Sequence, residues 1–177
     1  VPDSIVPGYY GVEAGQSAVG DLFYWFVKTF MRTPGEDPYH RYGVAAAALA
    51  PGESGLLALD WHNGNRTVLV DQKLTGLLVG MTLGTRSEEV YRAFLEATAF
   101  GARTIIERLE EYGIAVGRII ATGGLPEKNP LLMQICADVT GRELKIAASP
   151  QTCAVGAAIF GAIAAGPDAG GFARVAD

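Results

Sequence analysis

The sequence lacks the features that would place it in several common protein classes. It has two cysteines and two histidines in 177 residues, and their spacing matches neither a zinc site nor a disulfide framework. It has no block of basic residues, and 14 Lys and Arg against 19 Asp and Glu give a net charge of −5. A row of phosphates would meet little positive charge, so we expect no nucleic-acid partner.

Long hydrophobic runs suited to a membrane are also missing. The most hydrophobic long region, Ile146 to Pro167, contains Pro150 and is rich in Ala and Gly rather than in Leu or Phe. This composition indicates a buried helix that is too short and too weakly apolar to cross a bilayer. We therefore expect no membrane partner.

The N-terminus shows neither an initiator methionine nor a signal-peptide pattern. Because the chain begins in turn-rich sequence, "VPDSIVPGYYGVEAG", we expect it to be a piece of a longer polypeptide. The missing signal-peptide pattern and the few cysteines lead us to expect a cytoplasmic location. A composition of 49% hydrophobic and 19% charged residues is ordinary for one compact domain of this length. That domain is expected to cover residues 1–166, followed by a frayed, Gly- and Ala-rich tail over 167–177.

Helix and strand signals alternate along the chain, which predicts an α/β fold. Residues 33–42 are polar and contain proline, so we expect a break there, and the Asn63-Gly64 pair predicts a turn. The predicted helices are 16–31, 44–50, 87–112, 130–139 and 152–165, and the predicted strands are 55–60, 74–81, 118–121 and 143–147.

The helix predicted over 87–112 has the clearest signals. Ser87 is expected to be its N-cap, and acidic residues follow in the first turn, where they meet the positive end of the helix dipole. Ala93, Ala97 and Gly101 recur every four residues. This pattern of small side chains predicts a core helix that another backbone can approach closely.

The stretch "IIATGGLPEKNP", residues 119–130, allows two interpretations. In one, Gly123 and Gly124 form an ordinary strand-to-helix connection, and Asn129 caps a helix that has Pro130 in its first turn. In the other, the absence of two Cβ atoms lets a planar base or a phosphate lie against the backbone. The stretch is neither a Walker loop nor a G-x-G-x-x-G fingerprint, so at this point both interpretations stay open.

Six stretches in a fixed order resemble the C-terminal domain of the FGGY family of carbohydrate kinases. The resemblance runs from about Val6 to Gly166. The two stretches nearest the N-terminus, "EAGQSAVGD" with the preceding "VPGYYG" and "LDWHNGNRT", resemble the ribulokinases of this family more than its glycerol or xylulose kinases. The six are "EAGQSAVGD" (13–21), "LDWHNGNRT" (59–67), "GLLVGMTLGT" (76–85), "EEVYRAFLEATAFGAR" (88–103), "ATGGLPEKNPLLMQICADVTG" (121–141) and "CAVGAAIFGAIAAG" (153–166).

This resemblance implies an actin-like, ribonuclease-H-like nucleotide-binding domain, with a mixed sheet flanked by helices. Its partner would be the N-terminal domain of the same full-length chain, which closes with it around nucleotide and sugar. The implied activity is phosphorylation of a sugar hydroxyl by ATP with Mg²⁺, here the 5-hydroxyl of L-ribulose in L-arabinose catabolism. The alternatives are another pentulose or polyol kinase and a non-catalytic actin-like regulatory domain that binds a nucleotide. Homo-oligomerisation stays open.

The resemblance also implies nucleotide contacts in the stretch that contains the glycine pair. The second glycine of the pair and a residue four positions later contact the nucleotide in this family, and here they are Gly124 and Lys128, with Gly123 beside the first. Glycerol kinases carry Asn at the later position, so Asn129 is the alternative to Lys128.

A further nucleotide contact of the family lies at the glycine that opens the first helix, which matches Gly15. The family's glutamine partner follows in that helix, where counting gives Val19, so Gln16 is the candidate substitute. Glu13 is the candidate sugar-binding carboxylate, because it precedes this helix start; a solvated loop carboxylate is the alternative.

The family's catalytic Asp and its phosphate-binding hairpin belong to segments upstream of this chain. We therefore expect no catalytic residue and no metal ligand here, and negligible kinase activity from this chain alone. Trp61, Asn63 and Arg66 are expected to pack the domain, and an aromatic and polar edge of the cleft is the alternative. Glu96 is expected to be an ordinary exposed or hydrogen-bonded helix residue, and a place at the cleft is the alternative.

Overall fold

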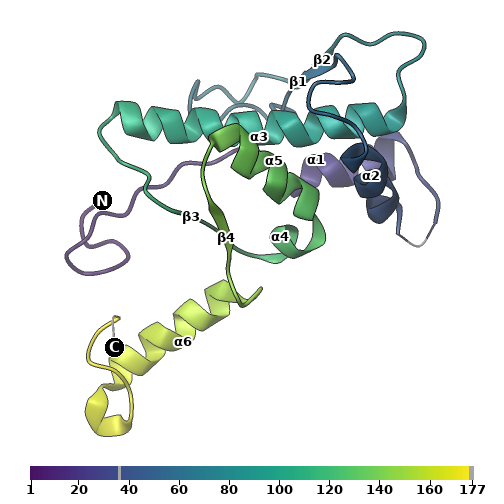
Figure 1. The fold of residues 1–177 in the computed structure, drawn as a ribbon. Helices are drawn as coiled ribbons and strands as arrows, with labels where there is room; N and C mark the ends of the chain where they lie inside the picture. Colours follow the sequence, from purple (N-terminus) through teal and green to yellow (C-terminus); the bar gives the residue numbers. More distant parts are fainter. Residues whose placement is uncertain (36, 176–177) are drawn as a thin grey trace. The chain divides into compact units, whose positions relative to one another are not determined.

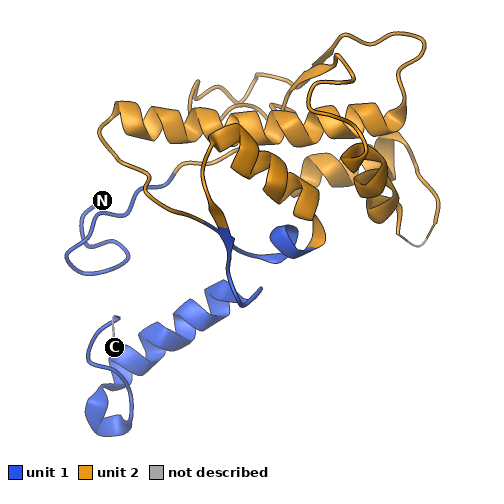
Figure 2. Ribbon diagram, viewed as in Figure 1, with its two compact units in different colours: residues 1–13, 120–127, 145–177 blue, residues 14–119, 128–144 orange. Residues whose placement is uncertain are grey.

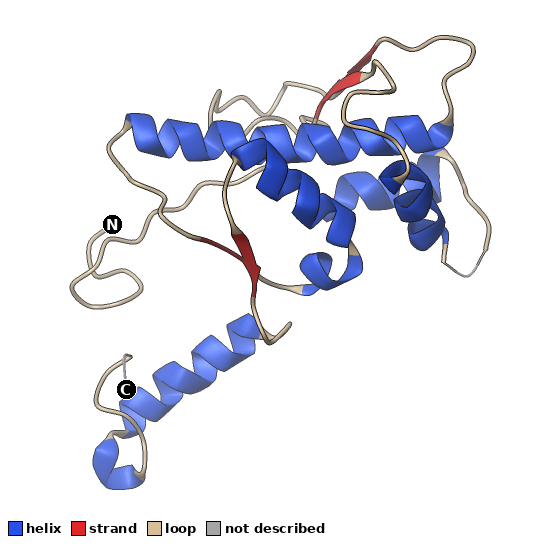
Figure 3. Cartoon of the chain, viewed as in Figure 1, coloured by secondary structure: helices blue, strands red, loops and turns tan. Residues whose placement is uncertain are grey.

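The computed structural model describes residues 1–35 and 37–175, and its helices and strands alternate as an α/β fold requires (Figures 1 and 3). Its elements are α1 (Gly20–Tyr24), the π-helix η1 (Trp25–Phe30), α2 (Pro38–Ala47), β1 (Leu57–Leu59), β2 (Leu77–Val79), α3 (Ser87–Glu111), β3 (Ile119–Ala121), α4 (Gly124–Lys128), α5 (Pro130–Thr140), β4 (Leu144–Ile146), α6 (Thr152–Ala165) and the 3₁₀ helix η2 (Pro167–Ala169).

The chain divides into two compact units (Figure 2). Unit 1 consists of residues 1–13, 120–127 and 145–177, and unit 2 consists of residues 14–119 and 128–144. The predicted site residues are shared between them, because Glu13 and the glycine pair lie in unit 1 and the other candidates in unit 2.

Unit 2 is built around α3, which packs against α1, α2, α5 and β1 (Figure 1). An aromatic cluster fills the space between these helices. The ring of Phe26, only 1% exposed, has its centroid 5.6 Å from that of Tyr42, 6.1 Å from Tyr91 and 5.5 Å from Phe94. Offset and edge-on contacts of this kind add to the free energy gained by burying the rings.

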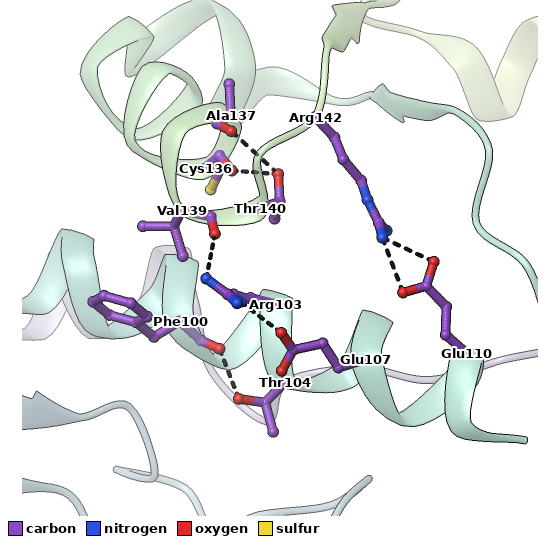
Figure 4. A network of polar contacts seen from close by, with 10 residues as sticks. All are labelled: Phe100, Arg103, Thr104, Glu107, Glu110, Cys136, Ala137, Val139, Thr140 and Arg142. Carbon is purple, nitrogen blue, oxygen red and sulfur yellow. Dashed lines mark hydrogen bonds and ion pairs between the residues drawn. The ribbon is translucent and has the colours of Figure 1, made fainter.

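The small-residue repeat of α3 lies against the core, as predicted. Ala93 and Ala97 are buried. At the other end of the helix, polar contacts join α3 to α5 and to the turn after it (Figure 4). Arg103 donates a hydrogen bond to the Val139 carbonyl (3.1 Å), and Arg142 donates to both carboxylate oxygens of Glu110 (2.8 and 2.9 Å).

The first strand pair is a short antiparallel ribbon in unit 2. Leu57 of β1 faces Val79 of β2, and Leu59 faces Leu77. Both predicted strands are therefore confirmed, although each keeps only three paired residues.

The starts of the first helices differ from the prediction. The helix expected from residue 16 begins at Gly20, because residues 15–17 make tertiary hydrogen bonds instead of helical ones. The break expected over 33–42 is also wrong, since α2 begins at Pro38 and ends at Ala47. Asp37 caps it by accepting a hydrogen bond from the His40 N–H (3.0 Å), and proline fits the first turn of a helix.

The predicted N-cap of α3 is wrong by one residue. Ser87 is already the first helical residue, and Arg86 precedes the helix. The carboxylate of Glu89 accepts a hydrogen bond from the Arg86 backbone N–H (2.7 Å), which is one half of a capping box. Glu89 therefore fixes the start of this helix instead of a serine hydroxyl.

Unit 1 contains α6 and all but the first residue of each of the paired strands β3 and β4, and the positions of these elements confirm the sequence prediction. The expectation that α6 is buried is wrong, because none of its side chains is buried. Among the described residues of unit 1 only Pro126 is buried. After α6, the Phe172 N–H donates to the Ala162 carbonyl (3.2 Å), and residues 176–177 of the expected frayed tail lie outside the described part of the chain.

Candidate functional site

The glycine pair follows β3, and its two members have different conformations. Gly123 has φ +85°, in the left-handed region that side chains rarely adopt, so backbone geometry alone accounts for glycine at this position. Gly124 opens the short helix α4, which replaces the loop expected between the pair and Asn129. A proline in the first turn, Pro126, favours this helix. Its positive φ therefore explains why residue 123 is glycine. The same explanation does not apply to Gly124.

Asn129 caps α5, as the sequence predicts. Its Oδ1 accepts a hydrogen bond from the Leu132 N–H (3.0 Å), and Pro130 occupies the first turn. Its Nδ2 donates to the Tyr91 hydroxyl (3.4 Å), whose pKa burial raises to about 12. Asn129 is only 9% exposed, whereas Lys128 beside it is exposed.

The glycine that opens the first helix is Gly20, because α1 begins there and not near Gly15. The residue four positions after it is Tyr24, whose side chain is 59% exposed. The sequence placed this helix start four residues too early. The true signal was the Val19-Gly20-Asp21 step, where an acidic residue falls in the first turn.

The backbone around Gly15 is held by the loop that follows β1. The Gly15 N–H donates to Thr67 Oγ1 (2.8 Å), and the same hydroxyl donates to the Gly15 carbonyl (2.7 Å). The Gln16 side-chain amide donates to the Asp60 carboxylate and to the Thr98 carbonyl (2.8 Å). Segments that lie 44 to 82 residues apart in the sequence are therefore joined by side-chain hydrogen bonds.

Asp60 is the most buried carboxylate of this region, at 6% exposure. Burial raises the pKa of its carboxyl group, and the hydrogen bond from Gln16 opposes that rise. Gly101 of α3 makes room for the pair, because a Cβ there would lie 2.6 Å from Gln16 Nε2 and 2.7 Å from Asp60 Oδ2. The last residue of the small-residue repeat of α3, Gly101, therefore lies against the polar contact between Gln16 and Asp60 and not against another backbone.

A cavity of about 330 Å³ lies beside this contact, wholly within unit 2. It brings Gly15 and Gln16 together with Trp61 and Arg66, for which a place at the edge of the cleft was the alternative to packing the domain. Its exposed lining surface is mainly apolar, and its polar residues include Asp60 and Gln16. A cavity of this size is at the lower limit of those that hold small molecules.

Three residues that contribute to this arrangement were not singled out from the sequence as site candidates: Asp60, Thr67 and Gly101. Thr67 ends the "LDWHNGNRT" stretch, and Asp60 ends the strand before it. Only the four-residue spacing of Gly101 carried a signal. Glu96 forms an ion pair with Arg92 (2.6 Å) and is mostly buried, which confirms the hydrogen-bonded alternative for this residue.

His62 has a packing role in the same loop. Its ring lies edge-on to Phe94 with centroids 5.2 Å apart and near Trp25 at 5.5 Å. Partial burial against these rings lowers the pKa of its imidazole, and the nearby Asp60 carboxylate opposes that shift. Over the described ranges, no cluster of three His, Cys, Asp or Glu side chains could hold a metal ion. In the same part of the chain, every helix falls short of the length and hydropathy that a membrane crossing requires.

The family model described as "FGGY family of carbohydrate kinases, C-terminal domain" matches residues 1–165. A ribulokinase of Geobacillus thermodenitrificans is 57% identical over 100% of this chain, which covers 33% of that protein. A ribulokinase of Anoxybacillus flavithermus is 58% identical over 99% of the chain, which covers 32% of it. The chain therefore spans about a third of the length of the curated relatives it matches.

The fold is similar to that of solved sugar kinases. A xylulose kinase from Rhodospirillum rubrum superposes with a TM-score of 0.75 at 31% identity, over 86% of this chain and 30% of that one. The similarity extends over most of the chain, so the arrangement of helices and strands is that of these kinases and not an isolated motif.

Proposed function

The chain belongs to the FGGY family of carbohydrate kinases as their C-terminal domain, and from this premise we propose that it supplies the nucleotide-binding half of an ATP-dependent sugar kinase. The substrate we propose is L-ribulose, which is converted to L-ribulose 5-phosphate. The observation that carries this proposal is the 57% and 58% identity to two ribulokinases over almost the whole chain. We assign the domain to residues 1–166.

Phosphoryl transfer depends mainly on positioning and on stabilising the charge of the transferred group. We assign nucleotide contact to Gly124, with Gly123 shaping the turn before it. We assign the contact four residues later to Lys128, because the amide of Asn129 is occupied by the cap of α5 and by Tyr91. An exposed ammonium on a flexible side chain is well suited to a nucleotide phosphate.

For the second nucleotide contact of the family we propose Gly15, with Gln16 as the substitute for the family's glutamine. The support is that both residues line the cavity of unit 2. Glu13 remains the proposed ligand of the sugar hydroxyls.

The metal of the reaction is Mg²⁺, which we propose arrives bound to the phosphates of ATP. Mg²⁺ commonly keeps several waters and binds through substrate phosphates and one or two carboxylates. We propose that no residue of this chain is its ligand. The general base and the remaining phosphate contacts are assigned to the proposed partner, the N-terminal domain of the full-length protein, in the cytoplasm.

The experiment that tests this function is a substrate panel with the full-length protein. ATP consumption is measured with L-ribulose, xylulose, ribitol and glycerol at equal concentrations. We expect kcat/KM to be highest for L-ribulose. A higher value for xylulose would support another pentulose kinase, a reading favoured by the similarity to the Rhodospirillum rubrum enzyme. No turnover with any of the four would support a non-catalytic nucleotide-binding domain.

A further inference from the structure

Helix α6 of unit 1 is apolar along its whole length, and yet none of its side chains is buried. Its 14 residues, TCAVGAAIFGAIAA, include no charged side chain. Val155 and Ile159 lie about one helical turn apart, with Phe160 next to them, so they share one side of the helix. These three side chains are 45%, 36% and 44% exposed. A soluble protein rarely leaves a continuous apolar face of this kind uncovered.

The apolar face of α6 continues into a cavity of about 1160 Å³ within unit 1. Phe160 and Ile163 of α6 line it together with residues of the N-terminal segment, among them Ile5, Tyr9 and Tyr10. The exposed surface of this unit 1 cavity is mainly apolar. Pockets that hold small molecules commonly measure about 300–1,000 Å³. The unit 1 cavity therefore suits a stretch of polypeptide better than a small ligand.

The strands of unit 1 are open to further pairing. β3 and β4 form a two-stranded sheet, and each has an edge that pairs with no other described strand. Ile120 and Ile146, one in each strand, are both 52% exposed. A pair of short strands is marginally stable alone, and an unpaired edge presents backbone N–H and C=O groups to another strand. Unit 1 thus offers both apolar side chains and backbone hydrogen-bonding groups to an occupant.

The position of Val1 indicates where such an occupant comes from. This chain covers about a third of the ribulokinases it matches, and the family model that matches it is a C-terminal domain, so in a protein of that length a long segment precedes Val1. The Val1 nitrogen donates to the Gly11 carbonyl (2.8 Å), and the Val1 carbonyl accepts from the Gly11 N–H (2.9 Å). Gly11 lines the unit 1 cavity. The preceding segment therefore enters unit 1 beside this cavity.

The tether also favours this segment over other occupants. A segment joined to the site by a short linker has an effective concentration in the millimolar range, whereas a second copy has only its own concentration in solution. A nucleic acid or a charged peptide would need charged side chains to recognise it, and α6 has none.

We propose that the segment of the full-length protein that precedes Val1 packs along α6 and into the unit 1 cavity, and adds a strand to the pair of β3 and β4. Its apolar side chains bury the face that contains Val155, Ile159 and Phe160. Unit 1 completes its hydrophobic core only in the full-length protein. This inference does not depend on which sugar the protein phosphorylates.

The first test is thiol labelling of the full-length protein with Phe160→Cys. The reaction with N-ethylmaleimide is followed by mass spectrometry of the peptide that contains residue 160. We expect labelling about 100-fold slower than in the same variant unfolded in urea, because the thiol reacts only when the packed segment opens. Labelling at the unfolded rate would overturn the proposal. Ile159→Cys is the second variant if Phe160→Cys does not fold.

The matched control for thiol labelling is Val44→Cys. Val44 lies on a helix of unit 2, α2, and is 58% exposed. An exposed helical cysteine needs no opening of the structure, so we expect labelling within about threefold of the unfolded rate.

The second test identifies the occupant by photo-crosslinking. Full-length protein with Phe160→p-benzoylphenylalanine is prepared in light and heavy isotopic forms, which are mixed and irradiated, and the linked peptides are identified by mass spectrometry. We expect residue 160 to be linked to a peptide that precedes Val1 in the same chain. Links between light and heavy chains would show a second copy, and links to unit 2 would show that unit 2 covers α6. Either result would overturn the proposal.

Discussion

Unit 2 and unit 1 differ in what holds them together. The buried hydrophobic core of the described residues, from Ala18 to Ile135, belongs to unit 2, whereas unit 1 buries only Pro126 among its described residues. In unit 1 the longest element, α6, is apolar along its whole length and has no buried side chain. Hydrophobic sequence is therefore not sufficient for burial, because burial also needs facing elements, and those described in unit 1 besides α6 are parts of β3, β4 and α4 and the 3₁₀ helix η2.

The difference also separates the proposed roles. In unit 2, Gly15 and Gln16 belong to a segment that is fixed by hydrogen bonds to buried groups. In unit 1, the glycine pair lies on a strand-to-helix turn with little buried around it. We infer that unit 2 provides a rigid framework, and that the turn of unit 1 gives its backbone to a ligand.

The largest expected effect comes from the aromatic core of unit 2. Phe26→Ala should destabilise the 177-residue chain by about 3–5 kcal/mol, because it removes a fully buried ring and leaves a cavity. Phe160→Ala, in α6, is the control and should cost less than about 1 kcal/mol, since Phe160 is 44% exposed. Urea unfolding followed by circular dichroism measures both. Equal costs would show that α6 is packed as tightly as the core.

The second effect compares two Arg–Glu pairs with the same spacing on α3. Glu96→Gln should cost about 3 kcal/mol, because it leaves the buried Arg92 without its counterion. Glu107→Gln breaks the pair with Arg103, which is about half exposed, and should cost less than about 1 kcal/mol. Urea unfolding followed by circular dichroism measures the cost of both substitutions. A large cost for Glu107→Gln would contradict the burial difference along this helix.

The third effect separates the two glycines of unit 1. Gly123→Ala should destabilise by about 1–2 kcal/mol, since φ +85° is unfavourable for a residue with a Cβ. Gly124→Ala is its control and should leave stability unchanged or slightly raised, because Gly124 is helical and alanine favours helices. Thermal unfolding of the two variants measures the difference. A larger loss for Gly124→Ala would mean that its backbone is under an unrecognised constraint.

The smallest effect concerns pH and the exposed end of α3. The hydrogen bonds from Arg142 lower the pKa of Glu110 below its ordinary value. Its folded pKa is below its unfolded one, so this contribution is present above the unfolded pKa and is lost as the pH falls through the folded pKa. Glu110→Gln should therefore reduce stability slightly at pH 7 and not at pH 3. A loss of equal size at both pH values would contradict this assignment.

Local signals predicted the later part of the fold well. The boundaries of α5 and α6 follow from Asn129, Pro130 and the small residues after Thr152, which act within a few residues of the chain. The first helix was misplaced because hydrogen bonds of Gly15 with Thr67 and of Gln16 with Asp60 hold these residues out of it. Such bonds connect residues about 50 positions apart, and no local pattern encodes them.

The candidate site was predictable only where it depends on a motif. The glycine pair and the capping role of Asn129 could be read from the sequence, and the resemblance to sugar kinases gave them a function. The contact of Gln16 with Asp60 could not be read from the sequence, because its prediction requires knowing that Gly101 of α3 lies against both side chains. The depth of burial of Asp60 was likewise a property of tertiary packing.

The central claim is that this chain provides the nucleotide side of a sugar kinase through Gly124. The most direct measurement is the KM for ATP of the full-length protein with Gly124→Val, compared with Gly43→Val, a helical glycine in α2 with open space around it. We predict a rise of about tenfold or more for Gly124→Val and none for Gly43→Val, since a side chain at Gly124 would occupy the place of the nucleotide. An unchanged KM for ATP in Gly124→Val, with L-ribulose still phosphorylated, would contradict the claim.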